Sequence, residues 1–248
     1  NTPNFKNIRY AAFGAANWSA GNNAEEQAAT RLHWTNMLEK LYASYDNYYT
    51  IEKDGKSYPV VNIWEEAALK SVFDPRGGHE NTKAFLLEMA AAFRAKGFNG
   101  VALFSRNPIT SLDTPELRQE LEQAGLIHYT STYLANYVPS TITSGLFTYP
   151  EVVDAFSPKP DPYNILGIAS NLTTHTPHPS KWKCPGSTPA EFQRWLQKAT
   201  DYLRTDTERQ KIITVYNMSE WSEGSAGLFP TVGNGFGYLE AIKNVLAP

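Results

Sequence analysis

Short apolar runs of strand type alternate with helical patterns six times along this sequence, and this alternation constrains the fold more than any other feature. The runs are rich in β-branched and aromatic residues and span Asn7–Phe13, Pro59–Trp64, Gly100–Phe104, Leu126–Tyr129, Tyr163–Ile168 and Ile212–Tyr216. Such an alternation is typical of a parallel sheet wrapped by crossover helices. No linker-like stretch interrupts it, so we expect residues 1–248 to form a single α/β domain.

Helical spacing and local end signals place the segments between these strands. Apolar periodicity predicts helices over about 24–43, 80–96, 150–156 and 236–246. Two more helices begin at caps: Thr114 precedes Pro115, and Thr188-Pro189-Ala190-Glu191 has the form of a capping box. Asp54-Gly55 predicts a tight turn leading into the second strand. Six β/α units are two short of the eight that make a β/α barrel.

The composition narrows the classes of ligand. A net charge of −3 with 19% charged residues leaves no basic patch for phosphates, which argues against nucleic acid. No apolar run reaches the length of a membrane span, and no basic-then-apolar leader stands at Asn1. Aromatic residues reach 13% of the chain; most should fill cores, but sugar-binding clefts also use them as flat platforms.

Neither a metal site nor another cofactor is expected. Cys184 is the only cysteine, which excludes an intrachain disulfide and leaves the redox compartment undetermined. His175 and His178 lack a third ligand at a recognisable spacing and are interpreted as surface-loop residues. The chain also lacks a Gly-x-Ser-x-Gly elbow and a phosphate-binding glycine loop. A secreted or extracytoplasmic location is favoured over a cytoplasmic one.

Polar and aromatic residues stand where the predicted strands end. Right-handed crossovers place the carboxyl ends of parallel strands at one edge, where α/β enzymes build their sites. Ser105 and His128 stand at two of these ends. The residues predicted to bind a neutral polyhydroxy ligand are Asn17, Trp18, Trp64, Glu65, Arg106, Tyr129, Tyr216 and Trp221. The simpler alternative for each is an ordinary polar rim.

Two carboxylates, Glu220 and Glu223, follow the last predicted strand with Trp221 between them. Glu-x-x-Glu pairs most often belong to solvated helix faces, but Trp221, Gly224 and Gly227 would make a poor solvated helix. Hydrolysis of a glycosidic bond needs two carboxyl groups, one acting as acid and one as base or nucleophile. Crowded carboxylates push their pKa values apart, which would leave one donor and one acceptor near neutral pH. Glu220 and Glu223 are therefore the predicted catalytic residues.

At these residues the sequence resembles the glycoside hydrolase family 99-like group, the WbsX-type proteins of polysaccharide gene clusters. The resemblance is most specific in the last 40 residues, where the group has Asn-Glu-Trp-x-Glu-Gly, a Leu-Glu-Pro-like segment and a closing Gly-Tyr-x-Tyr-Leu-x-Ala helix. The matching stretches here are 217–224, Leu228-Phe229-Pro230 and 235–241, with Ser219 and Phe229 departing from the pattern. The stretches 48–61 and 15–19 are also similar to parts of the group.

The resemblance implies a retaining endo-α-mannosidase-like hydrolase acting through a 1,2-anhydro sugar. Glu220 would be the base that assists the substrate 2-hydroxyl, and Glu223 the acid/base at the leaving oxygen. The group's first two β/α units have no counterpart here. Either they were cleaved off or lie on another chain, or the barrel is open or reduced to six strands. An exposed Ile8–Phe13 edge would favour self-association or a partner fragment that completes the barrel.

We therefore expect a TIM-barrel-like α/β fold with six of eight β/α units, which hydrolyses an α-linked glycan or polysaccharide without a cofactor. Two alternatives stay open: a glycosyltransferase-like role in polysaccharide assembly, and a non-catalytic carbohydrate-binding protein. No nucleotide-diphosphate site is visible to favour the first. Substitution of the two glutamates by glutamine distinguishes a hydrolase from a binding protein.

Overall fold

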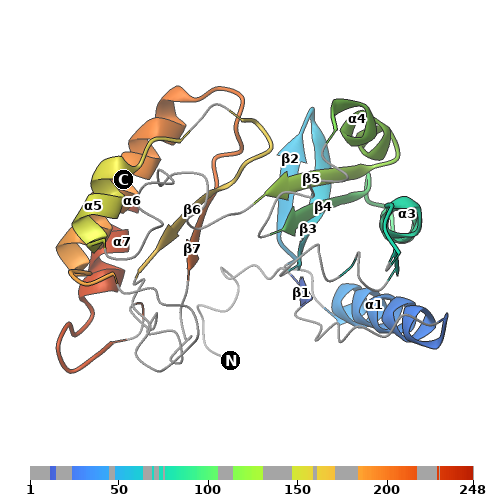
Figure 1. The fold of residues 1–248 in the computed structure, drawn as a ribbon, viewed down its shortest axis with the longest axis horizontal. Coiled ribbons are helices and arrows are strands. Elements are labelled where there is room, and N and C mark those ends of the chain that lie inside the picture. Colours follow the sequence, from blue (N-terminus) through green and yellow to red (C-terminus); the bar gives the residue numbers. More distant parts are fainter. Residues whose placement is uncertain are drawn as a thin grey trace. The chain divides into compact units, whose positions relative to one another are not determined.

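The computed structural model describes residues 12–14, 24–44, 48–63, 69, 73, 74, 76–105, 114–130, 147–158, 161–170, 184–216, 228 and 230–247. The chain divides into two compact units, Asn1–Thr130 and Ser131–Pro248. The single-domain expectation stays a prediction. Figure 1 shows the elements of both units.

The first unit contains a five-stranded sheet with strand order β1-β3-β4-β5 and with β2 paired to β3. Its elements are β1 (Ala12–Gly14), α1 (Ala24–Ser44), β2 (Thr50–Lys53), β3 (Lys56–Ile63), α3 (Glu80–Ala95), β4 (Val101–Ser105), α4 (Pro115–Gln123) and β5 (Leu126–Thr130). The pairs β1–β3, β3–β4 and β4–β5 are parallel. The predicted parallel α/β class is thus confirmed.

A local turn joins β2 to β3 in the one antiparallel pair among the described strands. Asp54 and Gly55 both adopt positive φ, 52° and 69°, as a type I′ hairpin turn requires. The Asp-Gly pair therefore forms the tight turn that the sequence predicts.

Both faces of the first unit's sheet are buried. On one face, α1, α3 and α4 lie on the same side of the strands (Figure 1), and Val61, Leu103 and Leu126 pack with Phe85 and Leu86 of α3. On the other face, the alternate residues Val60, Ala102, Phe104, Ile127 and Tyr129 are also buried. Burial on both faces explains why these strands are nearly continuous apolar runs.

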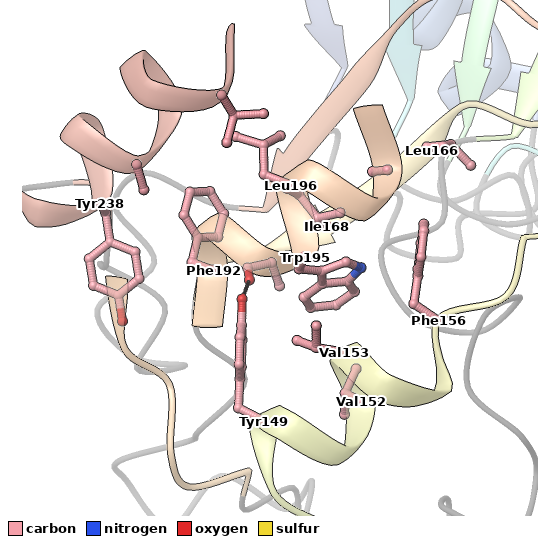
Figure 2. Packing of buried hydrophobic residues seen from close by; sticks show 14 of the residues in the cluster. Tyr149, Val152, Val153, Phe156, Leu166, Ile168, Phe192, Trp195, Leu196 and Tyr238 are labelled. Atoms are coloured by element: carbon pink, nitrogen blue, oxygen red, sulfur yellow. Dashed lines mark hydrogen bonds between the residues drawn. The ribbon is translucent and has the colours of Figure 1, made fainter. Parts of the chain in front are cut away.

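In its described residues, the second unit pairs two parallel strands and has three helices. Its elements are α5 (Tyr149–Ala155), β6 (Leu166–Ala169), α6 (Pro189–Thr205), β7 (Ile213–Tyr216) and α7 (Gly237–Leu246). Apolar residues of α6 at helical spacing, Phe192, Trp195, Leu196, Ala199 and Leu203, point into the core. Figure 2 shows Trp195 at the centre, beside Tyr149, Val153 and Phe156. The rings of Tyr149 and Phe156 meet the Trp195 indole edge to face.

The helix caps confirm two predictions and correct a third. Thr114 and Thr188 each accept a hydrogen bond from the backbone N–H three residues later, with proline in the first turn. However, the Glu191 carboxylate binds Arg194 at 2.6 Å, and Arg194 draws it away from the reciprocal bond of a capping box. A complete capping box forms instead at Thr148 and Glu151 of α5.

The described strands form no closed sheet, so the barrel stays a prediction. Among the helices that the structure describes, none combines the length and apolarity needed to cross a bilayer.

Candidate functional site

The predicted catalytic residues follow a strand end whose geometry is well defined. β7 runs parallel to β6, and Tyr216, its last residue, pairs with Ala169, the last residue of β6. The carboxyl ends of the two strands are therefore level, as the sequence predicts. Glu220, Trp221 and Glu223 come directly after this point in the chain but lie outside the described residues.

A second group of strand ends is level in the first unit. The register pairs Ile63 of β3 with Ser105 of β4, and Ser105 with Thr130 of β5. The predicted alignment of carboxyl ends is therefore confirmed for these three neighbouring strands. The predicted ligand residues that follow or flank the strand ends lie outside the described residues: Asn17, Trp18, Trp64, Glu65 and Arg106. Tyr216 is described by its backbone alone.

Tyr129 is the predicted ligand residue whose side chain is described. It precedes the last residue of β5, and its Cα partner across the sheet is Phe104. Its ring packs edge to face on Phe104, with centroids 5.4 Å apart, and is 1% exposed. In this structure the ring of Tyr129 therefore belongs to the buried face opposite α3, and a role in sugar binding stays a prediction.

The structure adds a contact between Ser105, the last residue of β4, and His128, which was predicted near a strand end but is the middle residue of β5. Ser105 Oγ lies 2.7 Å from His128 Nε2, within hydrogen-bond distance. Both side chains lie on the helix-covered face, because they alternate with residues of the opposite face. They are 1% and 4% exposed. A hydrogen bond satisfies buried polar groups, so this pair links the end of β4 to the middle of β5. Such burial does not suit a nucleophile that must meet a substrate.

Three hydroxyl groups surround the carboxyl end of β6 in the second unit. The Tyr149 hydroxyl donates to the Ala169 carbonyl at 2.5 Å, and the Ser187 hydroxyl donates to the Ser170 carbonyl at 2.6 Å. Ser187 Oγ also lies 2.8 Å from the Tyr238 hydroxyl. Because Ser187 has one hydroxyl proton, which it gives to Ser170, Tyr238 is the donor to Ser187. We call this chain Tyr238–Ser187–Ser170 the hydroxyl relay.

Electrostatics keep these groups protonated. Burial, reinforced by Tyr238, Cys184 and Glu191, raises the pKa of Tyr149 well above its ordinary value of 10.0. Burial also raises the pKa of Tyr238, although the hydrogen bond with Ser187 acts in the opposite direction. Burial and the charge of Glu151 raise the pKa of Cys184 to about 12. At neutral pH the two tyrosines are therefore hydrogen-bond donors, and Cys184 is an unreactive thiol.

Among the described residues, there is no group of three or more histidine, cysteine, aspartate or glutamate side chains that could hold a metal ion. His175 and His178 lie outside it.

Sequence reasoning located the strand ends but not the contacts between them. It placed Ser105 and His128 at neighbouring strand ends, although nothing in either segment indicated that the two side chains meet. The link between Ser187 and Tyr238 joins residues 51 positions apart, and the sequence carried no local signal for it.

A search against models of known protein families found no match to this chain, and a search among curated proteins found none either. The family resemblance therefore depends on the motif residues alone.

Proposed function

We propose that this chain is a retaining glycoside hydrolase that cleaves an α-linked glycan or polysaccharide internally, in the manner of an endo-α-mannosidase. The observation that carries the proposal is the position of Glu220 and Glu223 directly after β7, whose carboxyl end is level with that of β6. Loops that leave the carboxyl ends of parallel strands are where α/β enzymes place their catalytic groups.

The fold proposed for this function is a β/α barrel with six of its eight units in this chain. Support comes from the parallel pairs, from their level carboxyl ends and from the helices that follow the strands. Asn17, Trp18, Trp64, Glu65, Arg106, Tyr129, Tyr216 and Trp221 are the residues proposed to bind the glycan. A partner fragment or a second copy would complete the barrel.

Each glutamate is given one role in two steps. In the first step, Glu220 removes the proton of the substrate 2-hydroxyl, whose oxygen attacks the anomeric carbon to form a 1,2-anhydro sugar. Glu223 gives its proton to the glycosidic oxygen, which leaves. In the second step, Glu223 takes a proton from water as the water oxygen attacks the anomeric carbon, and Glu220 returns its proton to the 2-oxygen. The anomeric configuration is retained because the carbon is attacked twice.

Two glutamine substitutions test this assignment. Glu220→Gln and Glu223→Gln each remove a proton-transfer group and keep the side-chain shape, so kcat should fall by roughly 10²–10⁴-fold. Binding of the glycan should be largely unchanged. The measurement is the release of reducing ends from an α-mannan and from a panel of related glycans. Glu240→Gln is the matched control, because Glu240 is an exposed glutamate on α7 of the same unit, and it should leave kcat unchanged.

Three outcomes contradict the proposal. If the intact protein releases no reducing ends from any glycan in the panel but binds one, it is a carbohydrate-binding protein. If it instead transfers sugar from a nucleotide donor, the glycosyltransferase-like alternative is correct. Equal losses in the Glu240→Gln control would indicate a structural rather than a catalytic effect.

A further inference from the structure

Asn62 is a polar residue on an apolar face of the first unit's sheet. It alternates along β3 with Val61 and Ile63, whose side chains lie on the helix-covered face, so its own side chain lies on the opposite face. There it follows Val60, and its Cα partner in β4 is Phe104. Val60 and Phe104 are buried, whereas Asn62 is half-buried. Solvent therefore reaches this face of the sheet at Asn62.

Asn62 also stands at the carboxyl end of the sheet. Asn62, Phe104 and Tyr129 are the next-to-last residues of β3, β4 and β5, and the register sets them in one level row. The row one step earlier on this face consists of buried apolar residues: Val60, Ala102 and Ile127. The face therefore changes from a packed apolar row to a row with an amide, at the end of the strands where α/β enzymes build their sites.

The surroundings of Asn62 hold its position. The neighbouring Phe104 ring is buried and packs edge to face on the buried Tyr129 ring, with centroids 5.4 Å apart. At Asn62, β3 is paired with β1 on one side and with β4 on the other. A binding residue needs a backbone and neighbours that fix its geometry before the ligand arrives, and a paired central strand beside packed rings supplies both.

We propose that Asn62 is a substrate-binding residue that recognises hydroxyl groups of a neutral sugar. The assignment rests on the proposed function, which gives the class of ligand. A carboxamide carries two N–H donors and an acceptor oxygen, so it can donate to one sugar hydroxyl and accept from the adjacent one. It is uncharged, which suits a neutral ligand. Small-molecule sites fix the orientation of a ligand with a few polar groups set among apolar and aromatic residues, as Asn62 is set here.

Asn62→Ala tests the proposal, because it removes the amide at a half-buried position. The probe is an α-mannan oligosaccharide, and its Kd is measured by calorimetry in the Glu223→Gln background so that the sugar is not consumed. We expect the Kd to rise about ten- to hundred-fold, as the loss of two hydrogen bonds implies. In the otherwise unchanged enzyme, KM should rise by a similar factor with kcat within about three-fold, because binding is lost equally from the ground and transition states.

Asn99→Ala is the matched control. Asn99 is an exposed asparagine whose side chain donates to the Ser57 carbonyl at 3.3 Å, near the amino end of β3. The same substitution there removes an amide at the opposite end of the same sheet, and it should leave the Kd within about two-fold of the wild-type value.

A second measurement needs no variant that must fold. Titration of the oligosaccharide into isotope-labelled wild-type protein should shift the side-chain amide resonances of Asn62 and leave those of Asn99 in place. A wild-type Kd in a folded Asn62→Ala, an equal loss of affinity in Asn99→Ala, or unmoved Asn62 resonances at saturation overturns the assignment and leaves the hydrolase proposal standing. A wild-type protein that binds the sugar without cleaving it contradicts the proposed function alone, since binding still decides the role of Asn62. A protein that binds no glycan contradicts both.

Discussion

At the scale of single residues, the buried carboxylate of Asp74 organises the start of α3. Its oxygens accept four hydrogen bonds of 2.6–3.1 Å from the backbone and side chains of Asn81 and Thr82. His79, at the N-cap position, makes no side-chain cap bond. Asp74 therefore supplies the acceptors that the first N–H groups of a helix need, and its negative charge suits the positive end of the helix dipole.

The pKa of Asp74 links this contact to pH. Burial alone would raise the pKa, but the hydrogen bonds from Thr82 and Asn81 outweigh it and lower the pKa below the ordinary 3.8. A lowered folded-state pKa means that the charged form is stabilised by folding. The charged Asp74 carboxylate therefore contributes to the free energy of unfolding. This contribution is complete above the ordinary pKa of 3.8 and is lost as the pH falls through the lower pKa of the folded protein.

We expect Asp74→Asn to lower the free energy of unfolding by about 1–3 kcal/mol at pH 7, because its amide NH₂ must face N–H or O–H donors. The measurement is urea denaturation of both proteins from about pH 7 to pH 2. The difference should shrink as the wild-type carboxylate is protonated, below about pH 4.

Asp201→Asn is the control for this prediction. Asp201 forms an exposed ion pair with Arg204 at 2.8 Å, and such pairs contribute about 0–1 kcal/mol. If wild type and Asp74→Asn differ in free energy of unfolding by the same amount from pH 7 to pH 2, the electrostatic explanation is refuted.

At the scale of helices and strands, local signals determine most of what the sequence predicts. Periodicity and caps place all six predicted helices, because an amphipathic stripe or a capping threonine acts within one or two turns. The exception at Glu191 has the same kind of cause, a competing partner one turn away in Arg194. Contacts such as Asp74–Thr82, Ser105–His128 and Ser187–Tyr238 escape prediction because they depend on how separate segments come together.

Gly100 shows such a dependence at the start of β4. The sequence predicts it as the first strand residue, whereas β4 begins at Val101. Gly100 has a φ of +148°, and a Cβ atom there would lie 1.8 Å from the Gly125 carbonyl oxygen. That carbonyl also accepts a hydrogen bond from the Val101 N–H at 2.8 Å. The absent side chain is what lets the starts of β4 and β5 approach.

We therefore expect Gly100→Ala to lower the free energy of unfolding by about 1–3 kcal/mol, because backbone atoms must move to relieve the overlap. Gly233→Ala is the control, since nothing lies within 4 Å of its added Cβ, and its change should stay within about 0.5 kcal/mol. Chemical denaturation of both variants checks the prediction. If Gly100→Ala is as stable as the wild type, the starts of β4 and β5 can move apart without a cost in free energy.

At the scale of the whole molecule, each unit has its own hydrophobic core. One core surrounds Leu86, Phe93 and Leu103, and the other surrounds Trp195. The sequence predicts the parallel α/β class of both, because strands that alternate with helices have few other ways to bury two faces. It does not predict which strands share a sheet, since β4, β5 and β6 are similar buried apolar runs, and each could pair with several partners.

The β2–β3 hairpin has a consequence for the order in which the first unit folds. Its strands pair across the Asp54-Gly55 turn, whereas β3–β4 and β4–β5 join segments separated by a helix. A hairpin closes within roughly 1–10 μs, while non-local pairs must first pay the entropy of a long loop. The hairpin can therefore form early and offer β3 as a preformed edge for β4.

Gly55→Ala tests this order, since alanine is strained at a φ of 69° and should cost about 1 kcal/mol. If the hairpin is formed in the transition state, nearly all of that cost appears as slower folding, with unchanged unfolding, in stopped-flow measurements. A change confined to the unfolding rate would place the turn late. The parallel sheet of the first unit would then depend, for the speed at which it assembles, on a turn of two residues.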